Sequence, residues 1–124
     1  MRQRVAIARA LALQPRLLLM DEPFAALDAQ NRVILQAELV RICEATGKTV
    51  IYITHSIEEA LLMGDRTVVM TAQPGRIKEI IDIPFPHPRD VMELSATPEF
   101  GALKLTIWRI LEEEVMRVRA EIEG

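Results

Sequence analysis

The sequence predicts an α/β fold in which short parallel strands are flanked by helices. Two continuous apolar runs, at residues 17–20 (LLLM) and 49–54 (TVIYIT), are typical of strands that are buried on both faces of a parallel sheet. A long helical pattern separates them, and strand, helix, strand is the order of a right-handed βαβ crossover. The 124 residues are enough for one modest domain.

The first half of the chain contains clear helix boundaries. Residues 2–13 have high helix propensity, and Pro15 forces an end near Gln14. Asp28 can cap a second helix that runs to about Thr46, where Gly47 stops it. Its apolar stripe is predicted from Val33, Ala37 and Val40, widened by Leu35, Leu39 and Ile42.

The second half predicts one more helix, a strand and a strand that folds back on it. Ser56 and Glu59 have the spacing of a capping box, and Gly64 closes the helix that they open. Residues 67–70 (TVVM) predict a strand, and the Pro74-Gly75 turn precedes the returning strand. The returning strand is indicated by Ile77, Ile81 and Ile83.

The chain after residue 83 divides into two further segments. Residues 84–97 contain three prolines within FPHP and its flanks and predict a stiff connector. Residues 98–124 predict an amphipathic helix, with Thr97 as its cap and Pro98 in its first turn. The apolar face of this helix would consist of Phe100, Leu103, Ile107, Leu111, Val118 and Ile122.

Composition excludes several classes of protein. The net charge is −3, so no general electrostatic attraction to nucleic acid or to an acidic membrane is expected. The single cysteine, Cys43, cannot form an internal disulfide. No apolar run reaches the roughly 18 residues of a membrane span. The N-terminal MRQRVAIARA lacks the apolar core of a signal peptide.

Polar residues that could perform chemistry follow the two apolar runs. Asp21 and Glu22 come directly after the first, and His55 comes after the second. Ligand sites in open α/β sheets gather beyond the carboxyl ends of parallel strands. Consecutive residues of an extended chain point in opposite directions, so one acid could hold a cation through water while the other faces an attacking water. Phosphoryl transfer needs this division of roles.

The same residues also have purely structural interpretations. An Asp-Glu pair after a strand is often a solvated turn, and Asp28 is a good helix cap in its own right. A lone histidine before a capped helix is most often a loop residue. Only the joint arrangement of strand, acids, proline, Asp28, helix, strand and His55 favours a site.

That arrangement resembles a known family. LLLMDEPFAALD is similar to the Walker B strand and D-loop of ABC-type ATPases, YITHSIEEA to their switch-histidine region, and RQRVAIARAL to the helix after their LSGGQ signature. The resemblance implies that Asp21 holds Mg²⁺ through water and that Glu22 is the catalytic glutamate. It also implies that Asp28 couples two sites across a dimer, that His55 contacts the γ-phosphate, and that Met1 ends the signature motif.

The resemblance covers residues 1–83, which would form the C-terminal part of an ABC ATPase domain that lacks its N-terminal half. No G-x-x-x-x-G-K-[ST] loop occurs in the sequence, and the LSGG that precedes Met1 in the family is not in it. Either a start misassigned at an internal methionine or a fragment is therefore expected, with weak or no ATP binding and no turnover by this chain alone. An incomplete sheet with uncovered apolar surface is also expected.

The tail, residues 75–90 followed by TPEF and its long helix, is similar to the nitrate, sulfonate and taurine branch of bacterial importers. The intact protein would use ATP and Mg²⁺ on the cytoplasmic face of the membrane. Its expected partners are a transmembrane permease, a second ATPase subunit and, indirectly, an external solute-binding protein, but no nucleic acid. Two alternatives stay open: a catalytically dead remnant that acts as an interaction module, and an ABC-type ATPase outside transport.

Overall fold

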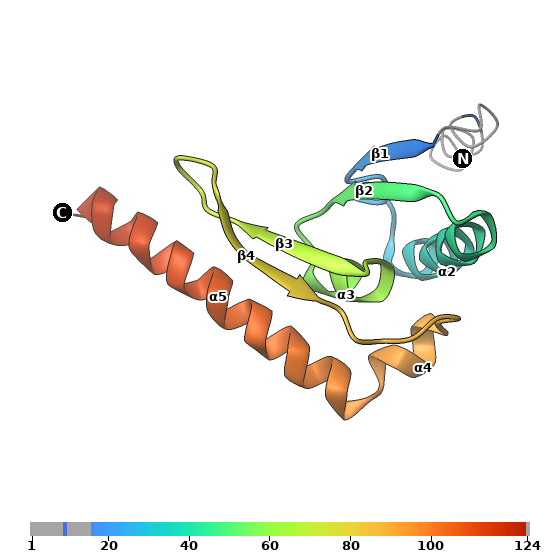
Figure 1. Ribbon diagram of the computed structural model, residues 1–124. Coiled ribbons are helices and arrows are strands. Elements are labelled where there is room, and N and C mark those ends of the chain that lie inside the picture. Colours follow the sequence, from blue (N-terminus) through green and yellow to red (C-terminus); the bar gives the residue numbers. More distant parts are fainter. Residues whose placement is uncertain (1–8, 10–15, 124) are drawn as a thin grey trace.

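The computed structural model describes Arg9 and residues 16–123. The elements in chain order are β1 (Leu17–Asp21), α2 (Ala29–Thr46), β2 (Thr49–Ile53), α3 (Ile57–Met63), β3 (Arg66–Met70), β4 (Ile77–Asp82), α4 (Val91–Ser95) and α5 (Pro98–Glu123) (Figure 1). Of the helix predicted over residues 2–13, only Arg9 lies in the described part, and it is helical. Among the helices described, none combines the length and apolar character needed to cross a membrane.

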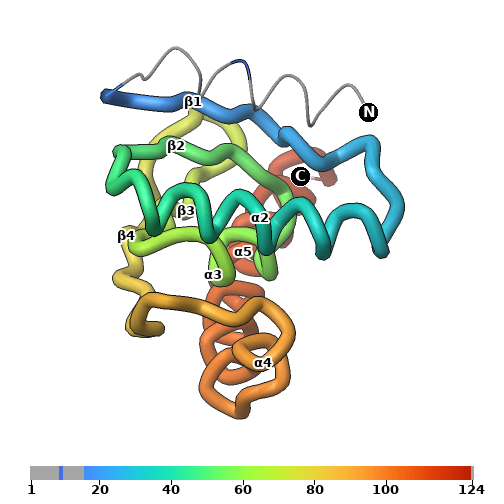
Figure 2. The backbone as a smooth tube through the Cα atoms, turned by 90° about the vertical axis from the view of Figure 1, so that its right-hand side faces the viewer, coloured from blue at the N-terminus to red at the C-terminus, as the bar shows by residue number. Residues whose placement is uncertain are grey.

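The predicted parallel strand pair is confirmed. β1 and β2 pair in parallel, with Leu17 opposite Thr49 and Asp21 opposite Ile53, and α2 connects them. Figure 2 shows α2 running alongside this strand pair. The fold is therefore α/β, with helices flanking parallel strands, as the sequence predicts.

One core cluster lies between β1 and α2. It consists of Leu18, Met20, Phe24, Leu35 and Leu39, all buried. The alternating pleat of β1 turns every second side chain toward α2, which explains why Leu18 and Met20 are inside. The strand pair is thereby held to the helix that follows it.

The prediction that these strands are buried on both faces is wrong. Leu19 is 66% exposed and Ile51, its partner in register, is 50% exposed. Leu17 and Ile53 are also exposed. The physical reason is that α2 covers one face, whereas no described element is packed on the other. The sheet is also open, as expected, because β1 and β2 form a two-stranded sheet by themselves.

The ends of α2 follow the sequence closely. Asp28 Oδ1 accepts a hydrogen bond from Asn31 N at 2.9 Å, and Gly47 adopts a left-handed φ of 63°, which glycine accommodates without strain. The buried stripe differs from the predicted one, because Gln36 is buried whereas Val33 is 36% exposed. The helix therefore presents a polar side chain to the interior, and its partner is part of the site described below.

The second pair of strands forms a hairpin. β3 and β4 are antiparallel, with Arg66 opposite Asp82 and Val68 opposite Ile80, as the turn at Pro74-Gly75 predicts. A second core cluster lies between this hairpin and the helices α2, α3, α4 and α5. Its buried members are Val40, Leu61, Leu62, Val69, Ile83, Val91, Phe100 and Ile107.

Helix α5 runs along the hairpin (Figure 1). Phe100 and Ile107 are buried there, which agrees with the predicted apolar face at its start. The prediction fails toward the end, since Ile122 is 79% exposed. Toward this end of the helix, the buried carboxylate of Glu114 contacts the hairpin instead. It accepts hydrogen bonds from the backbone of Ala72, between β3 and β4, and from the side chain of Arg117.

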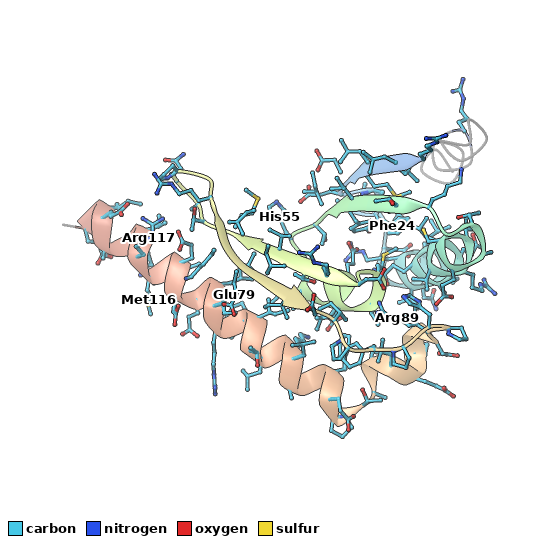
Figure 3. The ribbon with its side chains drawn as sticks, in the orientation of Figure 1. Phe24, His55, Glu79, Arg89, Met116 and Arg117 are labelled. Atoms are coloured by element: carbon cyan, nitrogen blue, oxygen red, sulfur yellow. The ribbon has the colours of Figure 1, made fainter. Side chains whose placement is uncertain are left out.

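Residues 84–97 include a short helix that the sequence analysis did not predict. α4 has Asp90 as its N-cap, which accepts a hydrogen bond from Glu93 N at 3.0 Å. Before it, the Arg89 side chain is buried and donates hydrogen bonds to the carbonyl oxygens of Phe85, Leu62 and Gly64 (Figure 3). The connector is therefore fixed to the body of the protein by a buried cation.

His87 closes this connection by contacting two carboxylates. Its Nδ1 contacts Glu44, on α2, and its Nε2 lies 2.7 Å from Asp65 Oδ1. Carboxylate oxygens only accept, so both contacts are satisfied only when both ring nitrogens carry a proton. The hydrogen bonds to Asp65 and Glu44 accordingly raise the pKa of His87 above its ordinary value of 6.5. Burial and Arg89 oppose this rise. The pKa of the nearby Cys43 thiol is raised by burial and by the same two acids.

We expect His87 to make the free energy of unfolding depend on pH. Because the folded pKa is raised, the stabilisation is complete below pH 6.5 and is lost as the pH rises through the folded value. Urea unfolding of the wild type and of His87→Gln at pH 6 and pH 9 measures this, and the difference between the two proteins should shrink at pH 9. An equal difference at both values would contradict a protonated His87.

Candidate functional site

The candidate site lies where β1 and β2 end side by side. Asp21 is the last residue of β1 and is exposed, and Glu22 follows it. The backbone N–H of Glu22 donates to the carbonyl oxygen of Ile53, the last residue of β2, at 2.8 Å. This hydrogen bond continues the pairing one residue past the strand and fixes the position of the second acid.

Glu22 has a left-handed backbone, with φ at 45°. A non-glycine residue in this region is strained, and such strain persists where the surrounding structure imposes it. Two features impose this backbone conformation on Glu22: the hydrogen bond from its N–H to Ile53, and the burial of Pro23 and Phe24 after it. The chain therefore turns sharply at Glu22, and its carboxylate departs from the direction of the strand.

His55 meets this carboxylate. Its Nε2 lies 2.8 Å from Glu22 Oε1, and the imidazole is otherwise open, with 96% of the side chain exposed (Figure 3). A carboxylate oxygen can only accept, so Nε2 carries the proton in this contact. The structure thus brings together two of the residues singled out from the sequence, from the ends of two parallel strands.

Asp28 is engaged in a helix cap, not in the contact between Glu22 and His55. Asp28 caps α2, with Oδ1 bound to Asn31 N and Oδ2 3.2 Å from Asn31 Nδ2. Both of its carboxylate oxygens are therefore engaged within its own chain. Met1, predicted as the end of the signature motif, lies outside the described residues.

A buried carboxylate behind His55 was missed as a site residue by the sequence analysis. Glu59, on α3, is only 5% exposed and accepts hydrogen bonds from Gln36 Nε2 at 3.1 Å, Tyr52 Oη at 2.9 Å and Thr54 Oγ1 at 2.8 Å. Burial, together with the charge of this carboxylate, raises the pKa of Tyr52. The network therefore ties α2, β2 and α3 together directly beneath the His55 loop.

Only one of the two hydrogen bonds of the predicted capping box forms. Ser56 Oγ accepts from Glu59 N at 3.3 Å, as predicted, but the Glu59 side chain does not return to Ser56 N. That N–H donates to Thr54 Oγ1 at 2.9 Å, and Thr54 in turn donates to Glu59. The signals that could have revealed this network are Gln36 within an apolar stripe and Tyr52 within an apolar strand, each of which needs a buried partner.

The acids at the end of β1 are suited to a magnesium ion that takes most of its ligands from water and phosphate. Among the described residues, no group of three His, Cys, Asp or Glu side chains could hold a metal by itself. Mg²⁺ usually keeps several waters and binds one or two carboxylates together with phosphate oxygens. The exposed Asp21 carboxylate, which has no hydrogen bond to another described side chain, suits that role.

Comparison with known proteins identifies the family. A family model described as ABC transporter matches residues 1–25. An ABC transporter ATP-binding protein of Methanocaldococcus jannaschii is 53% identical over 117 residues, which are 94% of this chain and 42% of that protein. The nitrate import ATP-binding protein NrtC of Synechococcus elongatus is 46% identical over 115 residues, 92% of this chain and 18% of that protein.

A third relative is the taurine import ATP-binding protein TauB of Roseobacter denitrificans, 46% identical over 122 residues, 94% of this chain and 46% of that protein. The chain therefore belongs to the ABC transporter ATP-binding family. It spans less than half the length of each of these relatives and corresponds to part of an ABC ATPase domain.

Proposed function

We propose that this chain forms the hydrolytic part of an ABC importer ATPase, whose phosphate-binding loop is supplied by residues outside these 124. The observation that carries the proposal is the 2.8 Å contact between Glu22 and His55 at the adjacent ends of two parallel strands. A carboxylate and an imidazole at that edge can orient a water and a phosphate, which phosphoryl transfer requires.

The proposed roles follow from the geometry of the side chains. Glu22 accepts a hydrogen bond from the attacking water, and His55 holds Glu22 in place through Nε2–H. The same N–H can turn to a phosphate oxygen, which would free Glu22 Oε1 for the water. Asp21, on the open side of the strand end, would bind Mg²⁺ through water, and the ion when bound neutralises charge on the phosphates.

The pairing of two such subunits is also part of the proposal. Asp28, which caps α2, would couple the two sites of a dimer. Met1 would end the signature motif that faces the partner's nucleotide. The permease and, indirectly, an external solute-binding protein are the other proposed partners, with the ATPase at the cytoplasmic face of the membrane. The proposed cargo is a small anion such as nitrate, sulfonate or taurine, and relatives that import nitrate and taurine support this class.

A chimaera tests the chemistry. These 124 residues replace the matching segment of the Roseobacter taurine import ATP-binding protein, which supplies the rest of the domain. The wild-type chimaera should hydrolyse ATP, and Glu22→Gln should slow hydrolysis at least about 100-fold while ATP still binds. The matched control is Glu79→Gln, an exposed acid of β4 (Figure 3), which should leave the rate unchanged.

Two outcomes would overturn the proposal. One is a Glu22→Gln chimaera that binds ATP and hydrolyses it at the wild-type rate. The other is ordinary ATP affinity in the isolated 124-residue chain, measured by equilibrium dialysis. That result would mean that the groups that bind the ATP phosphates lie within this chain. A chimaera in which His55→Ala lowers the rate and Glu79→Gln does not would support the role of the contact.

A further inference from the structure

The outer face of α5 carries large apolar side chains on the side away from the hairpin. Leu105 is 47% exposed, Trp108 54%, Val115 57% and Met116 57%. Figure 3 shows Met116 on the far side of the helix from the hairpin, whereas Arg117 lies on the hairpin side. Apolar residues gathered on one exposed helix face, unlike singly scattered ones, indicate an interaction surface.

Two opposite charges lie in the middle of this face. Arg109 and Glu112 are exposed, and neither has a hydrogen bond or ion pair to another described residue. Along the helix, Leu105, Arg109, Glu112 and Met116 are separated by four, three and four residues. Residues at such spacings form one stripe on a helix surface. We call these four residues the α5 stripe.

The spacings within the α5 stripe are the same from either end of the helix. The two outer residues are apolar, and the two central residues, Arg109 and Glu112, carry opposite charges. If a second α5 packs antiparallel with a two-fold axis between Arg109 and Glu112, Arg109 faces the partner's Glu112. Leu105 then faces the partner's Met116, and both contacts occur twice because such an interface is isologous. In the same arrangement Trp108 lies beside the partner's Val115, on one flank of the seam.

We propose that two copies of this chain associate through an antiparallel pairing of their α5 stripes. The apolar residues supply contact area, and the two Arg109–Glu112 pairs fix the direction and register. The equal number of positive and negative charges favours a second copy over an acidic lipid surface, which would select a basic face. The inference goes beyond the proposed ATPase site, and its test needs no nucleotide.

Charge reversal tests the register. In sedimentation equilibrium, the wild-type chain should dimerise, and Arg109→Glu or Glu112→Arg alone should weaken the dimer at least about tenfold, because each places like charges face to face twice. An equimolar mixture of the two single variants should dimerise again, since both facing pairs are then opposite in charge. Arg76→Glu, in the β3–β4 turn, is the control for net charge and should have no effect.

Cysteine cross-linking tests the direction. In a Cys43→Ser background, Leu105→Cys together with Met116→Cys should form disulfide-linked dimers on oxidation. Leu105→Cys alone should not, because two copies of residue 105 would lie roughly 16 Å apart along the antiparallel helices at 1.5 Å per residue. A monomer at every concentration, a dimer insensitive to both charge reversals, or cross-linking by Leu105→Cys alone would each overturn the proposal.

Discussion

Replacing Phe24 with alanine is expected to lower the free energy of unfolding by about 3–5 kcal/mol, the range for removing a buried aromatic side chain. Phe24 has no exposed surface and packs with Leu18, Met20, Leu35 and Leu39. Its ring centroid lies 6.3 Å from that of Tyr52, so it also joins the turn after β1 to β2. Such a loss is a large share of the roughly 5–15 kcal/mol that holds a typical domain folded.

Urea denaturation of the 124-residue chain followed by circular dichroism measures this loss. Ile122→Ala is the matched control, because it removes an apolar side chain that is 79% exposed and should change the free energy by less than about 0.5 kcal/mol. If Phe24→Ala lowered the free energy of unfolding by less than about 1 kcal/mol, packing of this ring would not be what holds the turn on the core. The turn also carries Glu22, so the same substitution should loosen the contact with His55.

Replacing Glu59 with alanine is expected to lower the free energy of unfolding by about 3 kcal/mol. The substitution leaves Gln36 Nε2 without its acceptor inside the protein and removes the partner of the Tyr52 and Thr54 hydroxyls. A buried donor left unpaired costs about 1–3 kcal/mol, and the half-buried hydroxyls recover part of their loss by binding water. The pKa of Tyr52 should also fall, because the carboxylate contributes to raising it.

Glu58→Ala provides the comparison, since it removes the same chemical group from the neighbouring residue of α3. Glu58 is exposed and pairs with Lys104 Nζ at 2.5 Å, and an exposed ion pair contributes at most about 1 kcal/mol. Both variants can be compared by urea denaturation and by ultraviolet titration of the single tyrosine. Equal losses for the two variants would mean that the Glu59 network adds nothing to an ordinary surface carboxylate.

Phe24 and Glu59 support the two halves of the candidate site from below. Phe24 anchors the turn that presents Glu22, and Glu59 holds Thr54, which precedes His55. The contacting atoms of Glu22 and His55 therefore stand on packed and hydrogen-bonded supports, although the histidine itself is open to solvent. This arrangement suits a site that must keep its geometry while it remains accessible to a ligand.

The features that the sequence predicted correctly are those encoded by neighbouring residues. Asp28 and Gly47 bound α2, Ser56 caps α3, and the Pro74-Gly75 turn joins β3 to β4, because caps and turns depend on side chains and backbone angles within a few positions. The parallel pairing of β1 and β2 followed from the long helix between them. The position of the two acids at the end of β1 was predicted because they directly follow its apolar run in the sequence.

Only the tertiary structure decided which distant side chains meet. The sequence by itself determined the elements, their order and the chemical types at the strand ends, because these depend on local propensity and period. The contact of Glu22 with His55, the burial of Glu59 and Gln36, and the exposed outer faces of β1 and α5 depend on which elements pack against each face. Packing joins residues that are far apart in the chain, so no local pattern specifies it.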